Sequence, residues 1–412
     1  MPDEPRLQPF SERTQKNLSC VHGAGKFFDG STILSKSFFL FFSSIEWMMD
    51  QAILSLYLGT IIATIYFLSK IDEGYPLKEP QSIPHLPKVS IIVPARNEAA
   101  NIRQCLNSLM ELHYPDYEII VVEGNSTDET RKIVENEFPN VTMIPEPPRP
   151  NGWVGKPWAC HIGQQHAKGQ ILLFTDADTI HHPDSLQKLV PALLTQTNGF
   201  LTIVTRQILK KFWEYTLVIV FQTIALSVYG GKGSGSRYLA NGQYLMFTRE
   251  AYDEIGGHQA VHDKIIEDME LASLGAAKGR KPIFFDVPEL VAVRMYRTFN
   301  DFFNGFAKNL AVGASTLSIA PIARNFLLQV WAIGWPFSLL LNHPLAIPTA
   351  AFGYLSYVAT CLYGQYRITR KITPHMILAP IYFIIYLFVL NYSFYLVTVK
   401  KKVKWKDISY QT

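Results

Sequence analysis

The chain has 412 residues, enough for two or three domains, and a formal net charge of +4. This small charge excludes the strongly basic composition of most nucleic-acid-binding proteins, so no nucleic acid partner is expected. Hydrophobic residues make up 48% of the chain and charged residues 17%, which indicates membrane segments. The four cysteines are far apart without CxxC spacing and are expected to be free thiols rather than disulfides or zinc ligands.

The N-terminal region predicts a polar tail followed by one membrane helix. Residues 1–37 are expected to form the tail, because they lack the apolar core of a signal peptide. Within 38–70, the uncharged run Gln51–Leu68 nearly spans a ~30 Å hydrocarbon core. The aromatic stretch Phe38–Trp47 either lengthens this helix or lies along the membrane surface. Residues 71–87 are proline-rich and predict a linker.

From Lys88 onward, short apolar runs alternate with helical patterns that carry charged faces. The pattern predicts βαβ units, and therefore an α/β fold with a mostly parallel sheet and flanking helices, over residues 88–313. Ligands of such sheets bind outside the carboxyl ends of the strands. The predicted strands are Val89–Val93, Tyr117–Val122, Val141–Ile144 and Ile171–Thr175, and the predicted helices include Glu98–Met110 and Asp128–Phe138.

Later apolar segments predict further membrane contact. Residues 212–229 are expected to form a membrane-interfacial or core helix, since a crossing there would separate Asp176 from Asp268. Gly230–Gly235 is expected to be a mobile loop that could close over a site. Residues 320–398 predict transmembrane helices and 399–412 a basic C-terminal tail. The candidate spans are Ile322–Leu341, Leu345–Tyr363 and Met376–Val397.

Asp176 and Asp178 follow directly after the apolar run Ile171–Thr175. Carboxylates gathered at a strand end repel each other and are costly to bury, and a divalent cation is the usual reason for them. Hard oxygen ligands suit Mg²⁺ or Mn²⁺, and such an ion commonly also holds a diphosphate. The alternative is a solvated turn between a strand and a loop.

Five segments with polar ends follow one another across the α/β region. They are V-S-I-I-V-P-A-R-N-E (Val89–Glu98), E-I-I-V-V-E-G-N-S-T-D-E-T (Glu118–Thr130), L-L-F-T-D-A-D-T (Leu172–Thr179), N-G-Q-Y-L-M-F-T-R-E-A-Y-D-E-I-G-G-H (Asn241–His258) and I-E-D-M-E-L (Ile266–Leu271). Together they resemble family 2 glycosyltransferases, whose GT-A fold is Rossmann-like. Val293–Asn309 lacks the Q-x-x-R-W motif of polysaccharide synthases. It resembles instead the subgroup that acts on carotenoids and related isoprenoid lipids, such as the diaponeurosporenoate glycosyltransferases.

The resemblance implies a nucleotide-sugar donor, and it implies roles for particular residues. Asp268 would be the general base, with Glu267 beside it as a second catalytic candidate. Asp178 and Asp176 would hold the divalent metal. Gly124 departs from the family, which often has a second Asp there, so the nucleotide stays open. The candidate donor-binding residues are Pro94, Glu98, Glu123, Asp128, Lys156, Asp176, Arg294 and Arg297.

Each of these roles has a structural alternative. Glu98 and Asp128 could be favourable charges at helix N-termini, and Lys156 a surface lysine. Arg294, Arg297 and Lys308 could be cations that lie beside the membrane. The paired His181–His182 and the His258/His262 pair lack a metal-binding framework and are expected to be loop residues.

The sequence therefore predicts an inverting, metal-dependent glycosyltransferase with a lipid acceptor. We expect a multi-pass protein of the cell membrane whose catalytic domain faces the cytoplasm, where sugar nucleotides are found. One alternative keeps the class: a polyprenyl-phosphate sugar synthase, or a polysaccharide or glycolipid glycosyltransferase. Another is a non-catalytic membrane scaffold that binds nucleotide sugars. Topology stays open, because one span before the domain and three after it would place the basic tail Lys400–Lys406 outside.

Overall fold

The computed structural model describes residues 30–71, 74–79, 83–229, 238–315, 319–396, 399, 402–405 and 408–411. The predicted loop Gly230–Gly235 and most of the predicted polar tail lie outside the described residues. The chain divides into two compact units, Met1–Leu54 and Ser55–Thr412. The first unit holds the beginning of helix α2, and every other element described below lies in the second.

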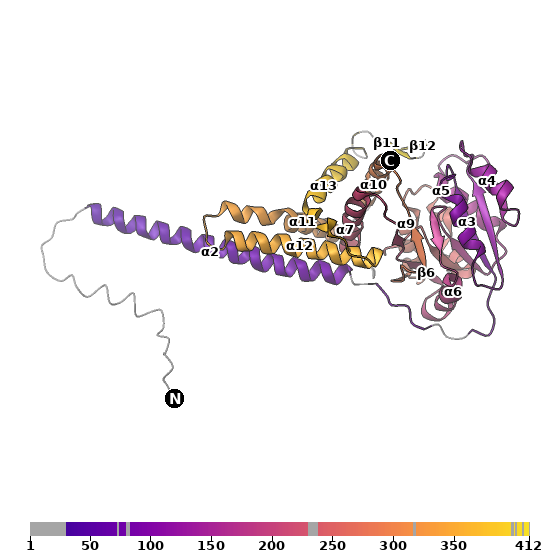
Figure 1. Cartoon of the computed structure of the whole chain (residues 1–412), viewed down its shortest axis with the longest axis horizontal. Helices are drawn as coiled ribbons and strands as arrows, with labels where there is room; N and C mark the ends of the chain where they lie inside the picture. Colours follow the sequence, from indigo (N-terminus) through magenta and orange to yellow (C-terminus); the bar gives the residue numbers. More distant parts are fainter. Residues whose placement is uncertain are drawn as a thin grey trace, which may run out of the picture. The chain divides into compact units, whose positions relative to one another are not determined.

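A seven-stranded sheet forms the centre of the α/β region, in the order β3-β2-β1-β4-β8-β6-β9 (Figure 1). Strand β1 pairs in parallel with β2 and β4, β2 with β3, and β6 with β9. Only β8 runs antiparallel to its neighbours, β4 and β6. The predicted, mostly parallel sheet is confirmed. Its strands are β1 Val89–Ala95, β2 Tyr117–Glu123, β3 Thr142–Pro145, β4 Ile171–Phe174, β6 Phe200–Ile203, β8 Leu245–Thr248 and β9 Ile283–Phe285.

Helices cover both faces of this sheet, because alternate residues of the buried strands point to opposite sides. Ile91 of β1 packs in one core cluster with Leu106 of α3 and Leu189 of α6. On the other face, Gly163 lets α5 approach closely, since a Cβ there would lie 2.4 Å from Ile92 Cγ2. The helices of this region are α3 Ile102–Met110, α4 Thr130–Glu137, α5 Gly155–His166, α6 Ser185–Gln196, α8 Arg249–Ile255 and α9 Glu267–Ala277.

A second, small sheet connects the end of β4 to the later part of the chain. It consists of β5 (Thr179–His181), β10 (Val291–Val293) and β7 (Arg206–Gln207), in the order β5-β10-β7. Strand β10 runs antiparallel to β5 and parallel to β7. This pairing brings the residues that follow β10 next to the turn that follows β4.

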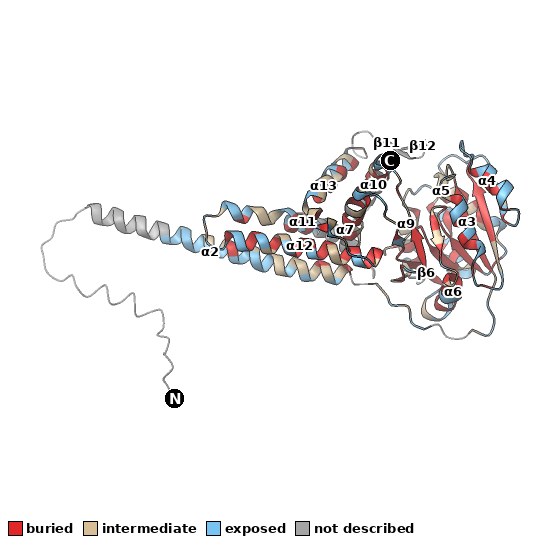
Figure 2. Cartoon of the chain, viewed as in Figure 1, coloured by how far each residue is buried: buried red, intermediate tan, exposed pale blue. Residues whose placement is uncertain are grey.

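The remaining helices pack through an aromatic core. Phe221 of α7 contacts Phe302 and Phe306 of α10 and Tyr386 of α13, with ring centroids 4.5–5.2 Å apart. Segment 212–229 therefore contributes buried residues to a helix core (Figure 2). The elements are α2 Gly30–Ile71, a π-helix Glu214–Val218, α7 Ile219–Tyr229, α10 Phe299–Ser315, α11 Ile319–Gly334, a 3₁₀-helix Trp335–Leu340, α12 Ala346–Thr369, a 3₁₀-helix Pro374–Leu378 and α13 Ala379–Tyr395.

Among the described residues, two helices are long and apolar enough to cross a membrane: Ser43–Ile71 and Pro374–Tyr395, each with a mean hydropathy of 1.9. The first is continuous with the aromatic stretch before it, inside α2. Of the three predicted C-terminal spans only the last meets both criteria, since Phe326–Leu340 is shorter and α12 less apolar. Where a basic tail was expected, Lys402–Trp405 (β11) and Ile408–Gln411 (β12) pair as antiparallel strands.

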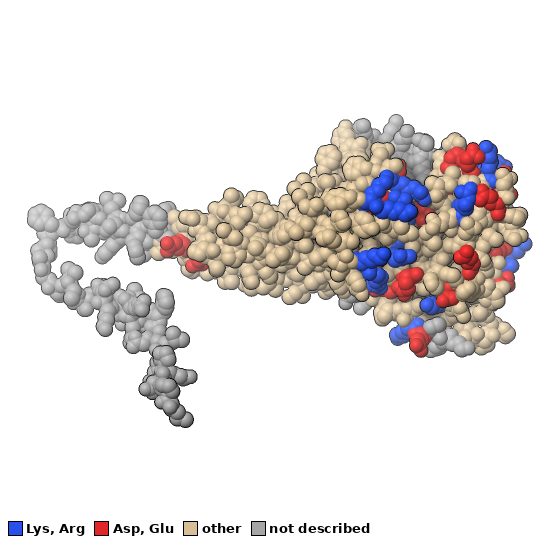
Figure 3. Space-filling model, viewed as in Figure 1, with Lys and Arg blue, Asp and Glu red and all other residues tan. Residues whose placement is uncertain are grey.

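Charge is distributed unevenly over the second unit. On the face shown in Figure 3, Lys, Arg, Asp and Glu side chains gather over the sheet region, while α11 and α12 show almost none. Exposed apolar side chains on these helices include Phe326, Leu327 and Ile347, and α13 exposes Ile384 and Phe388. The helices thus present an apolar exterior as well as an apolar core.

Candidate active site

The turn that carries Asp176 and Asp178 follows β4 and is held by its own backbone. The carbonyl oxygen of Asp176 accepts hydrogen bonds from Thr179 N at 3.3 Å and Thr179 Oγ1 at 2.7 Å. Thr175 Oγ1 donates to the carbonyl of Gln243 at 2.8 Å, which ties the strand end to the segment before β8. Both carboxylates are half-buried, at the carboxyl end of a parallel strand. These contacts thus fix the backbone positions from which the Asp176 and Asp178 side chains extend.

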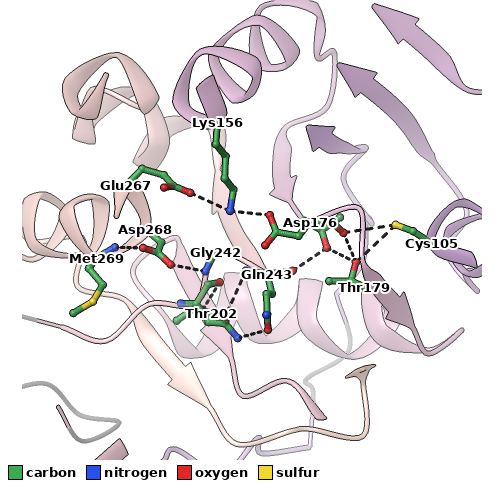
Figure 4. A network of polar contacts seen from close by, with 12 residues as sticks. Cys105, Lys156, Asp176, Thr179, Thr202, Gly242, Gln243, Glu267, Asp268 and Met269 are labelled. Atoms are coloured by element: carbon green, nitrogen blue, oxygen red, sulfur yellow. Dashed lines mark hydrogen bonds and ion pairs between the residues drawn. The ribbon is translucent and has the colours of Figure 1, made fainter. Parts of the chain in front are cut away.

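Lys156, in the first turn of α5, joins this turn to the start of α9. Its Nζ lies 2.7 Å from Asp176 Oδ1 and 3.0 Å from Glu267 Oε1 (Figure 4). The Glu267 side chain is only 6% exposed, so its charge needs a nearby cation. Burial opposes the lysine charge, but Asp176 and Glu267 raise the pKa of Lys156 well above its usual value. The ammonium group therefore stays charged.

Asp268 follows Glu267 and is oriented by two backbone donors. Its Oδ2 accepts from Gly242 N and its Oδ1 from Met269 N, both at 2.8 Å (Figure 4). Burial and the neighbouring Glu267 raise the pKa of Asp268 to about 6, although Lys156 acts in the opposite direction. A carboxylate with such a pKa can accept a proton near neutral pH. We call Lys156, Asp176, Glu267 and Asp268 the transfer centre.

Gly242 must be a glycine for this centre to form as it does. A Cβ at this position would lie 2.9 Å from Lys156 Nζ and 3.0 Å from Asp268 Oδ2. Any larger residue would push the ends of both side chains aside.

The loops after β1 and β2, residues 96–101 and 124–130, lie side by side and are called here the donor edge. Glu98 Oε2 accepts from Asn101 Nδ2 at 2.7 Å, and Glu98 N donates to Thr130 Oγ1 at 2.7 Å. Asp128 accepts from Ala99 N and Thr130 N, both at 3.0 Å. Burial raises the pKa of Asp128, but hydrogen bonds from the Thr130 hydroxyl and from these two backbone groups outweigh that effect and hold it below its usual value. Asp128 thus acts as a bridge between the two loops.

The strand ends beneath the donor edge carry the other predicted donor contacts. Pro94 lies in β1 opposite Val122. Glu123 is 1% exposed, and its Oε1 accepts from Ser126 N at 2.7 Å. Position 124 is a glycine and has no carboxylate of its own. A Cβ on Gly124 would lie 3.0 Å from Glu146 Oε2, so the Glu146 side chain, which follows β3, places a carboxylate next to this position.

The two predicted arginines have different surroundings. Arg294 Nη2 lies 3.0 Å from Glu214 Oε1, and that side chain, in the π-helix, is 2% exposed. Arg297 reaches the donor edge instead, where its Nη2 donates to Asn101 Oδ1 at 2.6 Å and to Ala100 O at 2.8 Å. Arg297 thus contacts the loop that precedes α3, whereas Arg294 contacts the helix core. The Lys308 side chain lies outside the described residues.

Two histidines expected in loops are buried instead. His181 lies in β5, where its Nε2 is 3.0 Å from Thr175 Oγ1, and burial lowers its pKa to about 3. His258 lies in a 3₁₀-helix (His258–Val261), with Nδ1 2.8 Å from Tyr252 OH and its pKa lowered by burial to about 3. Both are neutral packing residues. No group of three or more His, Cys, Asp or Glu that could hold a metal occurs within the described part of the chain.

Three cysteines, Cys105, Cys160 and Cys361, are free and buried, as expected, and Cys20 lies outside the described residues. Burial raises the pKa of Cys105 to about 12 and that of Cys160 well above its usual value.

Several polar residues of the site were not singled out from the sequence. Asn101 stands three residues after Glu98, a spacing that places it near Glu98 at a helix start, and this signal could have found it. Gly242 lies inside a segment that carried the family resemblance but has no chemistry of its own. Glu146 follows β3, and only the parallel pairing of β3 with β2 brings it to position 124.

Comparison with known proteins shows which sequences and folds this chain resembles. The model of the family "Glycosyl transferase family 2" matches residues 90–268. A curated relative, 4,4'-diaponeurosporenoate glycosyltransferase from Staphylococcus aureus (strain USA300), is 26% identical over 331 residues, covering 78% of this chain and 88% of its own length. The resemblance to the carotenoid-modifying subgroup is thereby confirmed.

The fold also resembles that of a solved structure. The mannosyltransferase PcManGT from Pyrobaculum calidifontis, in complex with GDP-Man and Mn²⁺, aligns with a TM-score of 0.51 and 20% identity. The alignment covers 83% of this chain and 99% of that one. Residues 90–268 therefore match the family 2 glycosyltransferase domain, and the chain is a glycosyltransferase with a GT-A-like fold.

Proposed function

We propose that the protein transfers a sugar from a nucleotide-sugar donor to an isoprenoid or carotenoid-like lipid, with inversion, and that Asp268 is the general base. The observation that carries this proposal is the convergence of Lys156, Asp176, Glu267 and Asp268 from three separate elements (Figure 4). A structural ion pair alone would not require a neighbouring carboxylate that is aligned by two backbone donors and titrates near neutral pH.

The transfer step is a single displacement. The acceptor hydroxyl oxygen forms a bond to the anomeric carbon while the bond from that carbon to the diphosphate oxygen breaks. The electron pair of the broken bond leaves with the diphosphate, and the hydroxyl proton passes to Asp268. Lys156 forms an ion pair with Glu267, which lies next to this base. Its ammonium group can also face the leaving diphosphate.

Asp176 and Asp178 fit a hard divalent cation. Both are half-buried oxygen donors on a fixed turn, and Mg²⁺ or Mn²⁺ is often held by one or two carboxylates together with substrate phosphates. We assign the larger share to Asp178, because Lys156 already pairs with Asp176. A metal bound there supplies positive charge for the diphosphate. Incubation with EDTA should abolish turnover and Mn²⁺ should restore it, and turnover that survives EDTA would refute this assignment.

A membrane location supports the lipid acceptor. Two helices with a mean hydropathy of 1.9 lie on either side of the sheet region in sequence, and in an apolar 18-residue stretch of each only 11% and 28% of the residues are buried. Exposed apolar faces of this kind are stable in contact with lipid. We further propose a multi-pass arrangement with the sheet region on the cytoplasmic side, where the donor is available.

The test is mass spectrometry of lipid extracts from cells with and without the protein, followed by assay of the purified chain with UDP- and GDP-sugars. With a hydroxyl acceptor, we expect a glycosylated lipid that is missing when Asp268→Asn replaces the wild type. A glycosylated polyprenyl phosphate would identify the alternative enzyme. Nucleotide-sugar binding without any product would identify the scaffold and refute the proposal.

The acceptor group can be distinguished in the same assay. A hydroxyl acceptor must lose a proton, whereas a carboxylic acid, the group named in the S. aureus relative, is already ionised at neutral pH. A hydroxyl acceptor should therefore make turnover depend strongly on Asp268, and a carboxylate acceptor only weakly.

A further inference from the structure

A chain of hydrogen bonds leads from Arg297 through Asn101 to Glu98. Arg297 donates to Asn101 Oδ1 from Nε at 3.0 Å and from Nη2 at 2.6 Å, and Asn101 Nδ2 donates to Glu98 Oε2 at 2.7 Å. The amide orientation is determined by its partners, because arginine only donates and a carboxylate only accepts. All three residues are half-buried. The Asn101 amide therefore links the position of the Arg297 guanidinium to that of the Glu98 carboxylate.

The arginine end of this chain is anchored to the helices. Arg297 O accepts from Lys211 Nζ at 2.7 Å, and α10 begins two residues later, at Phe299. Helix α10 in turn packs on the apolar helix α13, with the Phe303 and Tyr392 rings 5.2 Å apart. Displacement of α10 would pull on Asn101, which stands 196 residues away in the sequence.

We propose that Arg297 and Asn101 are positioning residues that fix the Glu98 carboxylate at the donor edge and couple it to the start of α10. The inference rests on the proposed function, with Glu98 as the donor-binding residue that the family resemblance implies. Arg297 then acts on the donor through Asn101 rather than by touching the diphosphate. Donor affinity depends on the placement of a helix that packs on a membrane-type segment.

Two variants distinguish this positioning role from contacts that only stabilise the fold. Asn101→Asp keeps the acceptor for Arg297 but replaces the donor to Glu98 with a second carboxylate, which repels it. Arg297→Ala has the opposite effect, because it removes the tie to α10 and leaves the bond between Asn101 and Glu98 in place. If the contacts only stabilise the fold, Arg297→Ala should have an effect and Asn101→Asp should not. If they position the Glu98 carboxylate, both variants should have an effect.

The experiment measures the affinity of the full-length protein for UDP and for GDP with Mn²⁺, by calorimetry, together with donor KM and kcat. We expect each variant to weaken the preferred nucleotide about tenfold and to raise donor KM similarly, with kcat within about threefold. Arg103→Ala is the matched control. It removes an exposed arginine of α3 that pairs with Glu137, and should change affinity less than about twofold.

The outcomes can be told apart. Asn101→Asp with wild-type affinity would overturn the positioning role and leave the proposed function intact. A uniform loss of thermal stability and kcat, with KM unchanged, would also overturn it. A wild-type protein that binds neither nucleotide would refute the proposed function itself.

Discussion

The donor edge and the transfer centre are stabilised in different ways. The two loops of the donor edge are joined by hydrogen bonds to backbone N–H groups and hydroxyls, such as those from Ala99 N to Asp128 and from Glu98 N to Thr130. The transfer centre is held by charge, with one ammonium group between two carboxylates. Hydrogen bonds of the first kind build a rigid surface before any ligand arrives. A charge cluster can instead rearrange when a charged substrate enters, since the partners of Lys156 can be exchanged.

The largest effect is expected at the base. Asp268→Asn keeps the shape of the side chain but cannot accept the proton, so kcat with a hydroxyl acceptor should fall about 10²- to 10⁴-fold. Nucleotide affinity should change little, because Asp268 does not belong to the donor edge. Equal losses of kcat and nucleotide affinity would mean that the two regions are not separate. Steady-state kinetics and calorimetry on the same preparation decide between these results.

The next effect concerns the cation of the transfer centre. Lys156→Met leaves Asp176 and Glu267 without their shared partner and raises the pKa of Asp268 further, because Lys156 lowers it. We expect kcat/KM at pH 7 to fall about ten- to hundredfold.

Lys264→Met provides the matched control, since Lys264 is an exposed lysine that pairs only with its neighbour Asp263 among the ion pairs of the described residues. Its turnover should match the wild type. A similar fall in both variants would show that loss of net charge, rather than the local ion pairs, is responsible.

A smaller effect is expected on the pH dependence of kcat/KM. Asp268 must be ionised to accept a proton, and its pKa is about 6 in the folded protein. With a hydroxyl acceptor, kcat/KM should be level above this value and fall about tenfold for each pH unit below it. Asp268→Asn should lack this limb. A wild-type profile that stays level down to pH 4.5 would assign proton transfer to another group or show that none is needed.

The smallest effect is a change in stability at the donor edge. Asp128→Ala removes the acceptor for Ala99 N and Thr130 N and should lower the free energy of unfolding by about 1 kcal/mol at pH 7. The folded-state pKa of Asp128 is depressed, so its contribution is present above the unfolded-state pKa. The difference from wild type should shrink as the pH falls through the depressed folded-state pKa.

Chemical denaturation at pH 7 and pH 3 measures this difference. Asp263→Ala, an exposed aspartate outside the donor edge, should cost less. If Asp128→Ala weakened nucleotide binding strongly without changing stability, Asp128 would be a donor contact rather than a bridge.

Much of the sheet could be predicted from the sequence because its parallel strands are short, continuous apolar runs. Val89–Val93, Tyr117–Val122 and Ile171–Thr175 lie within one or two residues of β1, β2 and β4. Strand β8 was not predicted, because its antiparallel place between β4 and β6 depends on contacts between residues that are far apart in the sequence. Helix 212–229 was ambiguous for a similar reason, since an apolar helix looks the same whether protein or lipid covers it.

The residues of the transfer centre could be predicted from the sequence, but the ion pairs between them could not. Lys156, Asp176, Glu267 and Asp268 were all candidate residues in the sequence, and the structure brings the four together. That Lys156 bridges two carboxylates depends on how α5 meets α9, which local sequence does not specify. The same is true of Arg297, whose partner Asn101 is brought near only by the pairing of β5 with β10 and by the packing of α3.

The buried cysteines have a practical consequence for topology mapping. Thiol reagents attack the thiolate, and Cys105 and Cys160 are both inaccessible and held in the protonated form. With Cys20 replaced by serine, a single cysteine introduced at an exposed position such as Lys264 would be the principal target of a membrane-impermeant maleimide. Labelling of intact cells, compared with labelling of opened ones, would then test the proposed orientation, in which the sheet region lies on the cytoplasmic side.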